Sequence, residues 1–427
     1  MIARVQSSDT IRIRGGLDIG LEGAPQQTLR DGHRSSSIAI SGHDFPGIRP
    51  KFKIEPGQRV QAGQTVFVDR KRPTIAFTSP VSGSVAAING AGRSFDSVEI
   101  RVDGDDEVRF DVQQPATPET IRQILLESGV WPAFLSRPFG RIPNPDAVTE
   151  AIFVTAMDTN PLAPDPKIAI GLHVDQFAAG LKILTLLTEG PVFVCHAPDA
   201  LPDFPTENQV RPITFTGRHP AGLAGTHIHH LMPAGYGCTV WQIGYQDVIA
   251  IGYLVSTGKP WCDRIVSLAG SGLRDAALVT VKRGTSLDDL LAHALVDHPS
   301  RVISGPLLTG RESGYLGFYH NQVTVLALPR GSQESQSSLS WFNRFLNRKQ
   351  GGGIIPNEAF EHALPPGILP VPLMRALCIG DVEMARDLGC LELVEEDMAL
   401  ISYLCTSGND YGALLRKVLD DLMGDGP

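Results

Sequence analysis

Short runs of alternating apolar and polar residues fill the N-terminal part of the chain and predict β-strands. Residues 53–88 read KIEPGQRVQAGQTVFVDRKRPTIAFTSPVSGSVAAI, and Gly57, Gly63 and Gly83 separate the β-branched runs. Glycines at such positions permit the tight turns of hairpins. Residues 96–102 continue the strand pattern, and the acidic GDDE at 104–107 predicts a linker. We therefore expect residues 1–105 to form a small β-barrel.

The pattern changes to alternating strands and helices between residues 106 and 258. Thr117, Pro118 and Glu119 predict a helix start, because a hydroxyl cap, a first-turn proline and an early acid all favour one. After a proline-rich stretch, strands are predicted at residues 151–156, 191–196 and 212–216, and a helix at residues 173–189. Such alternation favours a parallel sheet, so we expect residues 106–258 to form a Rossmann-like α/β domain.

The last two regions differ from each other and from the first two. In residues 259–330, short strands are predicted at 263–268, 277–282 and 301–304, with a capped helix after Gly284, which indicates a compact β-grasp domain. Residues 331–427 begin with a polar, glycine-rich linker at 331–353. Helices follow at residues 374–378, 382–388, 395–405 and 412–423. The expected fold is therefore multidomain α+β, ending in a helical domain.

Charge and composition limit the partners and the compartment. The net charge of −9 argues against a nucleic-acid partner and against electrostatic attachment to anionic lipid. The chain contains no apolar run long enough to span a membrane, and its N-terminus has no apolar signal region. The six cysteines form no CxxC pair. We therefore expect a soluble cytoplasmic protein without a disulfide framework.

The first domain resembles the biotinyl/lipoyl family. Gly63 and the PVSG turn at residues 80–83 match the family's two symmetric hairpins. The position expected for the modified lysine holds Pro73, although Lys71 lies nearby. We therefore predict a barrel without the modified lysine, acting as a docking or structural module.

A segment rich in glycine and histidine, GRHPAGLAGTHIHHL at residues 217–231, is the candidate site. One interpretation is a metal site, with His227 and His229 on one side of a strand. A second is an anion or quinone-headgroup site on a glycine-rich strand-to-helix loop, and the third is a structural loop with surface histidines. We place the metal site below the other two, which stay open. The candidate quinone contacts are His219, Gly222, Gly225, His227 and His229.

Other familiar site patterns are missing from the sequence. It contains no GxGxxG fingerprint, no P-loop and no GxSxG elbow. The acidic residues at 288–289 and 395–397 are interpreted as helix caps. Cys378, Cys390 and Cys405 are spaced unlike iron–sulfur ligands and are interpreted as structural thiols. We accordingly predict no catalytic residue and no metal ligand in this chain.

Together these motifs resemble one family, the A subunit of the sodium-translocating NADH:quinone oxidoreductase. The similarity is weaker to the C subunit of Rnf complexes and to the flavin subunit of respiratory complex I. The chain would then carry a soluble-ligand-binding (SLBB-type) β-grasp domain. The matching stretches are GGLDIGLEGAP (15–25), GIRPKFKIEPGQRVQAGQTVF (47–67), FTSPVSGSVAAI (77–88), GRHPAGLAGTHIHHL (217–231), WQIGYQDVIAIGYL (241–254), RVISGPLLTGR (301–311) and LMRALCIGDVEMARDLGCLELVEEDMAL (373–400).

The resemblance implies a peripheral protein on the cytoplasmic side of the bacterial inner membrane. Its complex would transfer electrons from NADH to ubiquinone and export sodium ions. Residues 135–143 lack the glycines of the complex I flavin loop, and residues 401–412 lack its run of cluster cysteines. Flavins and iron–sulfur centres would therefore belong to partner subunits, both integral and flavin-carrying, with ubiquinone as a candidate ligand here. The alternatives are a purely structural scaffold and, in another class, a free-standing metal hydrolase.

Overall fold

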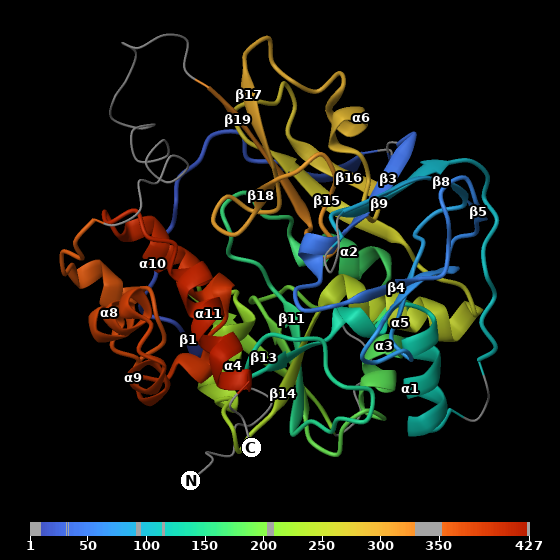
Figure 1. Ribbon diagram of the computed structural model, residues 1–427. Coiled ribbons are helices and arrows are strands. Elements are labelled where there is room, and N and C mark those ends of the chain that lie inside the picture. Colours follow the sequence, from blue (N-terminus) through green and yellow to red (C-terminus); the bar gives the residue numbers. More distant parts are fainter. Residues whose placement is uncertain are drawn as a thin grey trace.

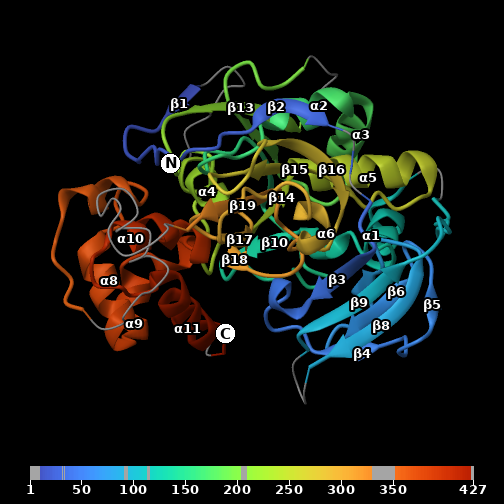
Figure 2. The same cartoon turned by 90° about the horizontal axis from the view of Figure 1, so that it is seen from above.

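The computed structural model describes residues 10–30, 32, 34–90, 95–112, 116–202, 209–328 and 352–424. In Figure 1 the α/β domain occupies the middle, the barrel lies on the right, the β-grasp domain at the top and the helical domain on the left. Figure 2 shows the helical domain and the barrel on opposite sides of the molecule from above. Within the described part of the chain, every helix is too short or too polar to cross a membrane.

The barrel consists of two small antiparallel sheets packed over aromatic side chains, as predicted. Phe67 stacks on Phe77 with ring centroids 4.5 Å apart, and Phe95 packs edge-on against Phe67. One sheet has the order β3 (Ser37–Ser41), β9 (Ser97–Val102), β8 (Gly83–Asn89) and β5 (Arg59–Val60), and the other β4 (Pro50–Phe52), β6 (Thr65–Asp69) and β7 (Ala76–Thr78). This is the barrel-sandwich arrangement expected from the sequence.

The hairpin that would carry a swinging lysine is tied down at its tip. Arg72 Nε lies 2.8 Å from Asp69 Oδ2 and forms an ion pair with it. The same guanidinium donates from Nη1 to the Ile142 carbonyl over 2.8 Å. These contacts fix the turn before Pro73 to the neighbouring domain.

The first two strands lie outside the barrel, which differs from the expected span of residues 1–105. Strand β1 (Thr10–Arg12) pairs in parallel with β13 at the edge of the α/β sheet. Strand β2 (Gln26–Arg30) pairs in parallel with β16 of the β-grasp sheet. Local alternation predicts that such segments are strands, but it carries no information on which sheet they join.

The α/β domain has a mainly parallel sheet with helices on both faces. The strand order is β1, β13 (Val210–Thr216), β12 (Val192–His196), β11 (Ala151–Ala156), β14 (Val240–Gly244) and the antiparallel β10 (Leu135–Arg137). The helices are α1 (Pro118–Glu127), α2 (Pro166–Leu172), α3 (Val174–Leu184), α4 (Ala224–Leu231) and α5 (Tyr245–Thr257). Helix α1 starts at the predicted Thr117 cap. The helix predicted at 173–189 is α3, which ends five residues earlier, at Leu184. The separate helix α2 directly before it was not predicted.

The remaining two domains also follow the predicted elements. The β-grasp sheet has the order β18 (Arg311–Glu312), β17 (Ser300–Ser304), β19 (Gln322–Ala327), β15 (Asp263–Ala269), β16 (Ala277–Lys282) and β2, with α6 (Leu287–Leu291) capped by Ser286. The helical domain contains α8 (Pro370–Ile379), α9 (Val382–Asp387), α10 (Ala399–Leu404) and α11 (Tyr411–Gly424). The predicted linker lies almost wholly outside the described residues.

Candidate functional site

A cavity of about 390 Å³ opens where the parallel strands of the α/β sheet end. Thr155 comes from the end of β11, and Gly244 from the end of β14. From β11 the chain runs outward to β12 and β13, then returns to β14 on the other side of β11. The crevice between β11 and β14 is therefore the switch point of the sheet, where open α/β sheets bind ligands.

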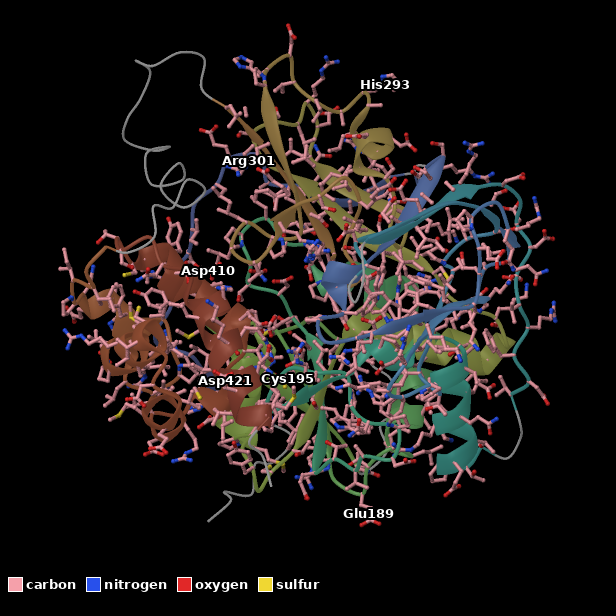
Figure 3. All side chains as sticks on the ribbon, viewed as in Figure 1. Glu189, Cys195, His293, Arg301, Asp410 and Asp421 are labelled. Carbon is pink, nitrogen blue, oxygen red and sulfur yellow. The ribbon has the colours of Figure 1, made fainter. Side chains whose placement is uncertain are left out.

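Two further domains complete the walls of this cavity. Pro306 and Tyr319 contribute from the β-grasp domain, and Glu395 and Glu396 from the helical domain. In Figure 3, Glu189, just before β12, lies at the bottom, Cys195 near its end lies higher, and Arg301 of the β-grasp domain is near the top. The carboxyl edge of the sheet thus faces the β-grasp domain, and the cavity lies at a three-domain junction.

The loop after β11 places a buried carboxylate in the cavity wall. Asp158 Oδ1 accepts hydrogen bonds from the Asn160 backbone N (2.8 Å) and from Asn160 Nδ2 (2.9 Å). Burial nevertheless raises the pKa of Asp158 from its ordinary 3.8 to about 6, since desolvation disfavours the charged form more than these two bonds favour it. The Asp158 carboxyl can therefore exchange a proton near neutral pH.

The fully buried Arg137 joins the helical domain to the α/β sheet beside the cavity. Its Nη1 donates to Asp397 Oδ2 (2.6 Å), and its Nη2 to Glu396 Oε1 (2.9 Å). Its Nε donates to Gln242 Oε1 of β14 (2.8 Å). Desolvation raises the pKa of Glu396, which the positive charge of Arg137 opposes. The sequence predicted that these acids are helix caps. Of the acids at 395–397, only Asp397 caps its helical turn as well as pairing with Arg137: its carboxylate accepts from the Val394 backbone N (2.8 Å).

The five residues predicted as quinone contacts do not meet at one opening. Only Gly222 is among the residues that line the cavity. His219 is buried beneath Thr159, with Nδ1 3.3 Å from Thr159 Oγ1. A side chain at Gly225 would lie 2.1 Å from Asp397 Oδ1, so that glycine permits close packing of the helical domain.

The histidine pair lies on helix α4 and not on a strand, so the predicted strand placement of His227 and His229 is wrong. His227 is fully buried, and its Nε2 donates to the Ala221 carbonyl over 2.9 Å. Burial lowers its pKa to about 3. His229 Nδ1 donates instead to Glu392 Oε2 (2.7 Å). Two residues apart on a helix, these imidazoles face different directions.

A metal site is not formed anywhere in the described ranges, where no three His, Cys, Asp or Glu side chains are arranged to hold an ion. Cys405 contacts the hydroxyls of Ser407 (3.1 Å) and Tyr411 (3.3 Å). All six cysteines are free thiols.

Apart from Gly222, the residues that line the cavity were not predicted as contacts. Asp158 follows β11 by two positions, and polar residues directly after a parallel strand were the available signal. No local pattern distinguishes Arg137 or Glu396, because each acquires its role from a partner more than two hundred residues away.

The domains and the cavity at their junction define a protein of the barrel-sandwich, α/β and SLBB class. Family models match in order: "NqrA N-terminal barrel-sandwich hybrid domain" over residues 11–103, "NqrA second alpha/beta domain" over 116–260 and "NQRA C-terminal domain", an SLBB model, over 265–314. The chain belongs to the NqrA family, the A subunits of the Na⁺-translocating NADH-quinone reductase.

Curated relatives match along their whole length. The A subunit of the Na⁺-translocating NADH-quinone reductase is 41% identical in Saccharophagus degradans and 42% identical in Neisseria gonorrhoeae, each over 97% of this chain and 100% of the relative. A solved NAD⁺-reducing [NiFe]-hydrogenase chain has a TM-score of 0.40 at 12% identity, covering 72% of this chain and 61% of that chain. That likeness is too weak to carry an argument.

Proposed function

We propose that this chain works as the peripheral A subunit of a respiratory complex that transfers electrons from NADH to ubiquinone and exports sodium ions. The observation that carries the proposal is the match of the whole chain to subunits of that name. In this proposal the chain lies on the cytoplasmic side of the inner membrane, bound to integral and flavin-carrying partner subunits.

The flavins and iron–sulfur centres belong to those partners in this proposal. Carboxylates line the cavity at Asp158, Asp247, Glu395 and Glu396, and among its described lining residues there is no lysine or arginine. A phosphate group of a flavin or nicotinamide nucleotide would therefore meet negative charge and no cation. This charge pattern supports a chain that holds no nucleotide of its own.

We place the quinone contact of the proposal in this cavity, with Gly222 as the retained member of the predicted set. Its volume of about 390 Å³ lies within the range of ligand pockets. Met157, Leu223 and Ile243 supply apolar wall, and Asn321 and Thr155 supply polar groups. A neutral ring with two polar substituents fits such a lining.

The competing proposal is a purely structural scaffold with no ligand. It is favoured by the ion-paired contacts of Arg137, which hold two domains together without any ligand. Equilibrium titration of the full chain with a short-chain ubiquinone separates the two proposals. Saturable binding supports the quinone contact, and no binding supports the scaffold.

A blocking variant makes this titration specific for the cavity. Thr309 lines the cavity with an exposed side chain, so Thr309→Trp should fill the opening without disturbing a core. We expect it to weaken quinone binding by about tenfold or more, the loss of roughly 1.4 kcal/mol or more. Thr74→Trp is the matched control, since Thr74 is also exposed but lies on the barrel. Equal effects of both variants would contradict the assignment to the cavity.

Membership of the complex is tested separately by co-purification. The chain should leave detergent-solubilised membranes together with integral, flavin-containing partners. A single soluble species without partners in its native cell would overturn the proposed function.

A further inference from the structure

Two residues that line the cavity each have a buried amide oxygen that accepts no hydrogen bond from any described residue. These oxygens are Asn160 Oδ1 and Gln322 Oε1. Gln322 is 2% exposed. An acceptor left without a donor in a buried site carries a cost of desolvation, which a ligand with a donor would relieve.

The orientation of both amides is fixed by their other hydrogen bonds. Gln322 Nε2 donates to the Pro161 carbonyl (2.9 Å) and to Thr324 Oγ1 (2.9 Å). Because a carbonyl only accepts, turning this amide would place two oxygens against each other. Asn160 Nδ2 likewise faces the Asp158 carboxylate, which also accepts from the Asn160 backbone N. Both oxygens are therefore acceptors without a donor.

The charges around these oxygens favour the same kind of ligand. Glu395, Glu396 and Asp247 form ion pairs with arginines that do not themselves line the cavity. Among the described residues no cation forms an ion pair with Asp158, and its carboxylate adds a further acceptor. A neutral ligand that donates hydrogen bonds suits these acceptors, whereas an accepting group placed against them would set oxygen against oxygen.

We infer that the cavity prefers the reduced p-hydroquinone to the oxidised quinone, and this inference rests on the proposed quinone contact. The two hydroxyls of the hydroquinone donate to the acceptors at Asn160 and Gln322. The carbonyls of the quinone find no complement in these two groups. The hydroquinone gains a buried hydrogen bond where the quinone leaves an acceptor unpaired. This difference corresponds to about a tenfold difference in dissociation constant.

The test compares two probes on the full chain. Ubiquinone and ubiquinol with a single isoprenoid unit are titrated separately, under anaerobic conditions for the ubiquinol, by calorimetry or ligand-observed NMR. Binding of ubiquinol about tenfold tighter than ubiquinone supports the inference. Equal or tighter binding of ubiquinone overturns the inference and leaves the quinone contact standing. If neither probe binds, the proposed contact fails and the inference fails with it.

A substitution at Gln322 tests whether this side chain causes the preference for ubiquinol. Gln322→Met keeps the length of the side chain and removes the acceptor, so the affinity for ubiquinol should fall about five- to tenfold while that for ubiquinone stays within about twofold. The matched control is Gln209→Met, since Gln209 Nε2 also donates to two carbonyls but lies at the amino end of β13. An equal loss in both variants, or an unchanged preference in Gln322→Met, contradicts the assignment. If Gln322→Met does not fold, the two-probe comparison on the unaltered chain still decides.

Discussion

Buried ionisable side chains near the cavity give the protein two opposite responses to pH. Burial raises the pKa of the Asp158 carboxyl to about 6. Burial lowers the pKa of His219 and His320 to about 4 and that of His227 to about 3. A group that binds its proton more tightly when folded stabilises at low pH, and one that binds it less tightly stabilises at high pH. Substituting the carboxyl and the histidine in separate variants therefore distinguishes the two responses to pH.

Asp158→Asn should remove a loss of stability that accompanies rising pH. The contribution of Asp158 is fully present below pH 3.8 and is lost as the pH rises through about 6. Between pH 4 and pH 7 the unaltered chain should lose about 1–3 kcal/mol of unfolding free energy relative to the variant. Denaturant titrations at several pH values measure this difference. Asp111→Asn, at an exposed carboxylate, should show no such difference.

His227→Gln should reduce the sensitivity to acid. The buried neutral His227 contributes stability above pH 6.5, and this contribution is lost as the pH falls toward about 3. Between pH 7 and pH 5 the unaltered chain should lose about 2 kcal/mol more than the variant. The exposed His293 supplies the control, and His293→Gln should leave the acid dependence unchanged. Identical pH curves for all three proteins would contradict a buried neutral His227.

At the scale of elements, a pair of glycines sets how closely α3 and α5 pack. A Cβ at Gly180 would lie 2.1 Å from the Val248 carbonyl oxygen, and one at Gly252 would lie 1.8 Å from that of Gln176. Both obstacles are backbone atoms, which cannot move aside as a side chain would. The two helices therefore touch backbone to backbone beneath the sheet that carries the cavity.

Gly180→Ala should destabilise the fold by about 2–3 kcal/mol, because the added methyl group forces α3 and α5 apart. Unfolding in denaturant measures the change. Gly171→Ala, in helix α2, has nothing within 4 Å of the added methyl group and should stabilise by about 0.5–1 kcal/mol. The opposite signs distinguish close packing from helix propensity. A stabilising Gly180→Ala would contradict the close packing of these helices.

At the scale of the whole molecule, one fully buried guanidinium holds the helical domain to the α/β sheet, alongside more exposed contacts such as the His229–Glu392 pair. Arg137 reaches Glu396, Asp397 and Gln242 at once, joining the C-terminal helices to the sheet. A second pair links Arg416 to Glu395 within the helical domain. Both sets of contacts include an acid that lines the cavity, so they help to hold its helical wall in place.

Arg137→Ala should cost about 3–5 kcal/mol, because it leaves Glu396 and Asp397 without their cation in a buried place. We also expect faster hydrogen exchange across helices α8 to α11, which would loosen first. Arg137→Lys should not restore stability, since an ammonium cannot match the planar fork that reaches three partners. Arg386→Ala is the control. It removes an exposed pair with Asp387 and should change stability by less than about 0.5 kcal/mol.

Elements with strong local signals could be predicted closely, and long-range partners could not. The continuous apolar run at Ala151–Ala156 is β11 with the predicted bounds, and Thr117 caps α1 as expected. The cavity escaped prediction because its polar groups come from three domains. The glycines and histidines at residues 217–231 contribute to packing. Gly222 and Gly225 allow neighbouring groups to approach closely, and His227 is fully buried in the core.

The sequence by itself determined the order and type of the domains and the missing lysine at Pro73, because turn residues and apolar periodicity act within a few positions. Only the tertiary structure decided that strands β1 and β2 join other sheets. It alone brought Asp158 and Gln322 to one cavity and Arg137 to its acids. Burial and charge pairing arise between residues far apart in the chain, so desolvation and unpaired acceptors have no local signature.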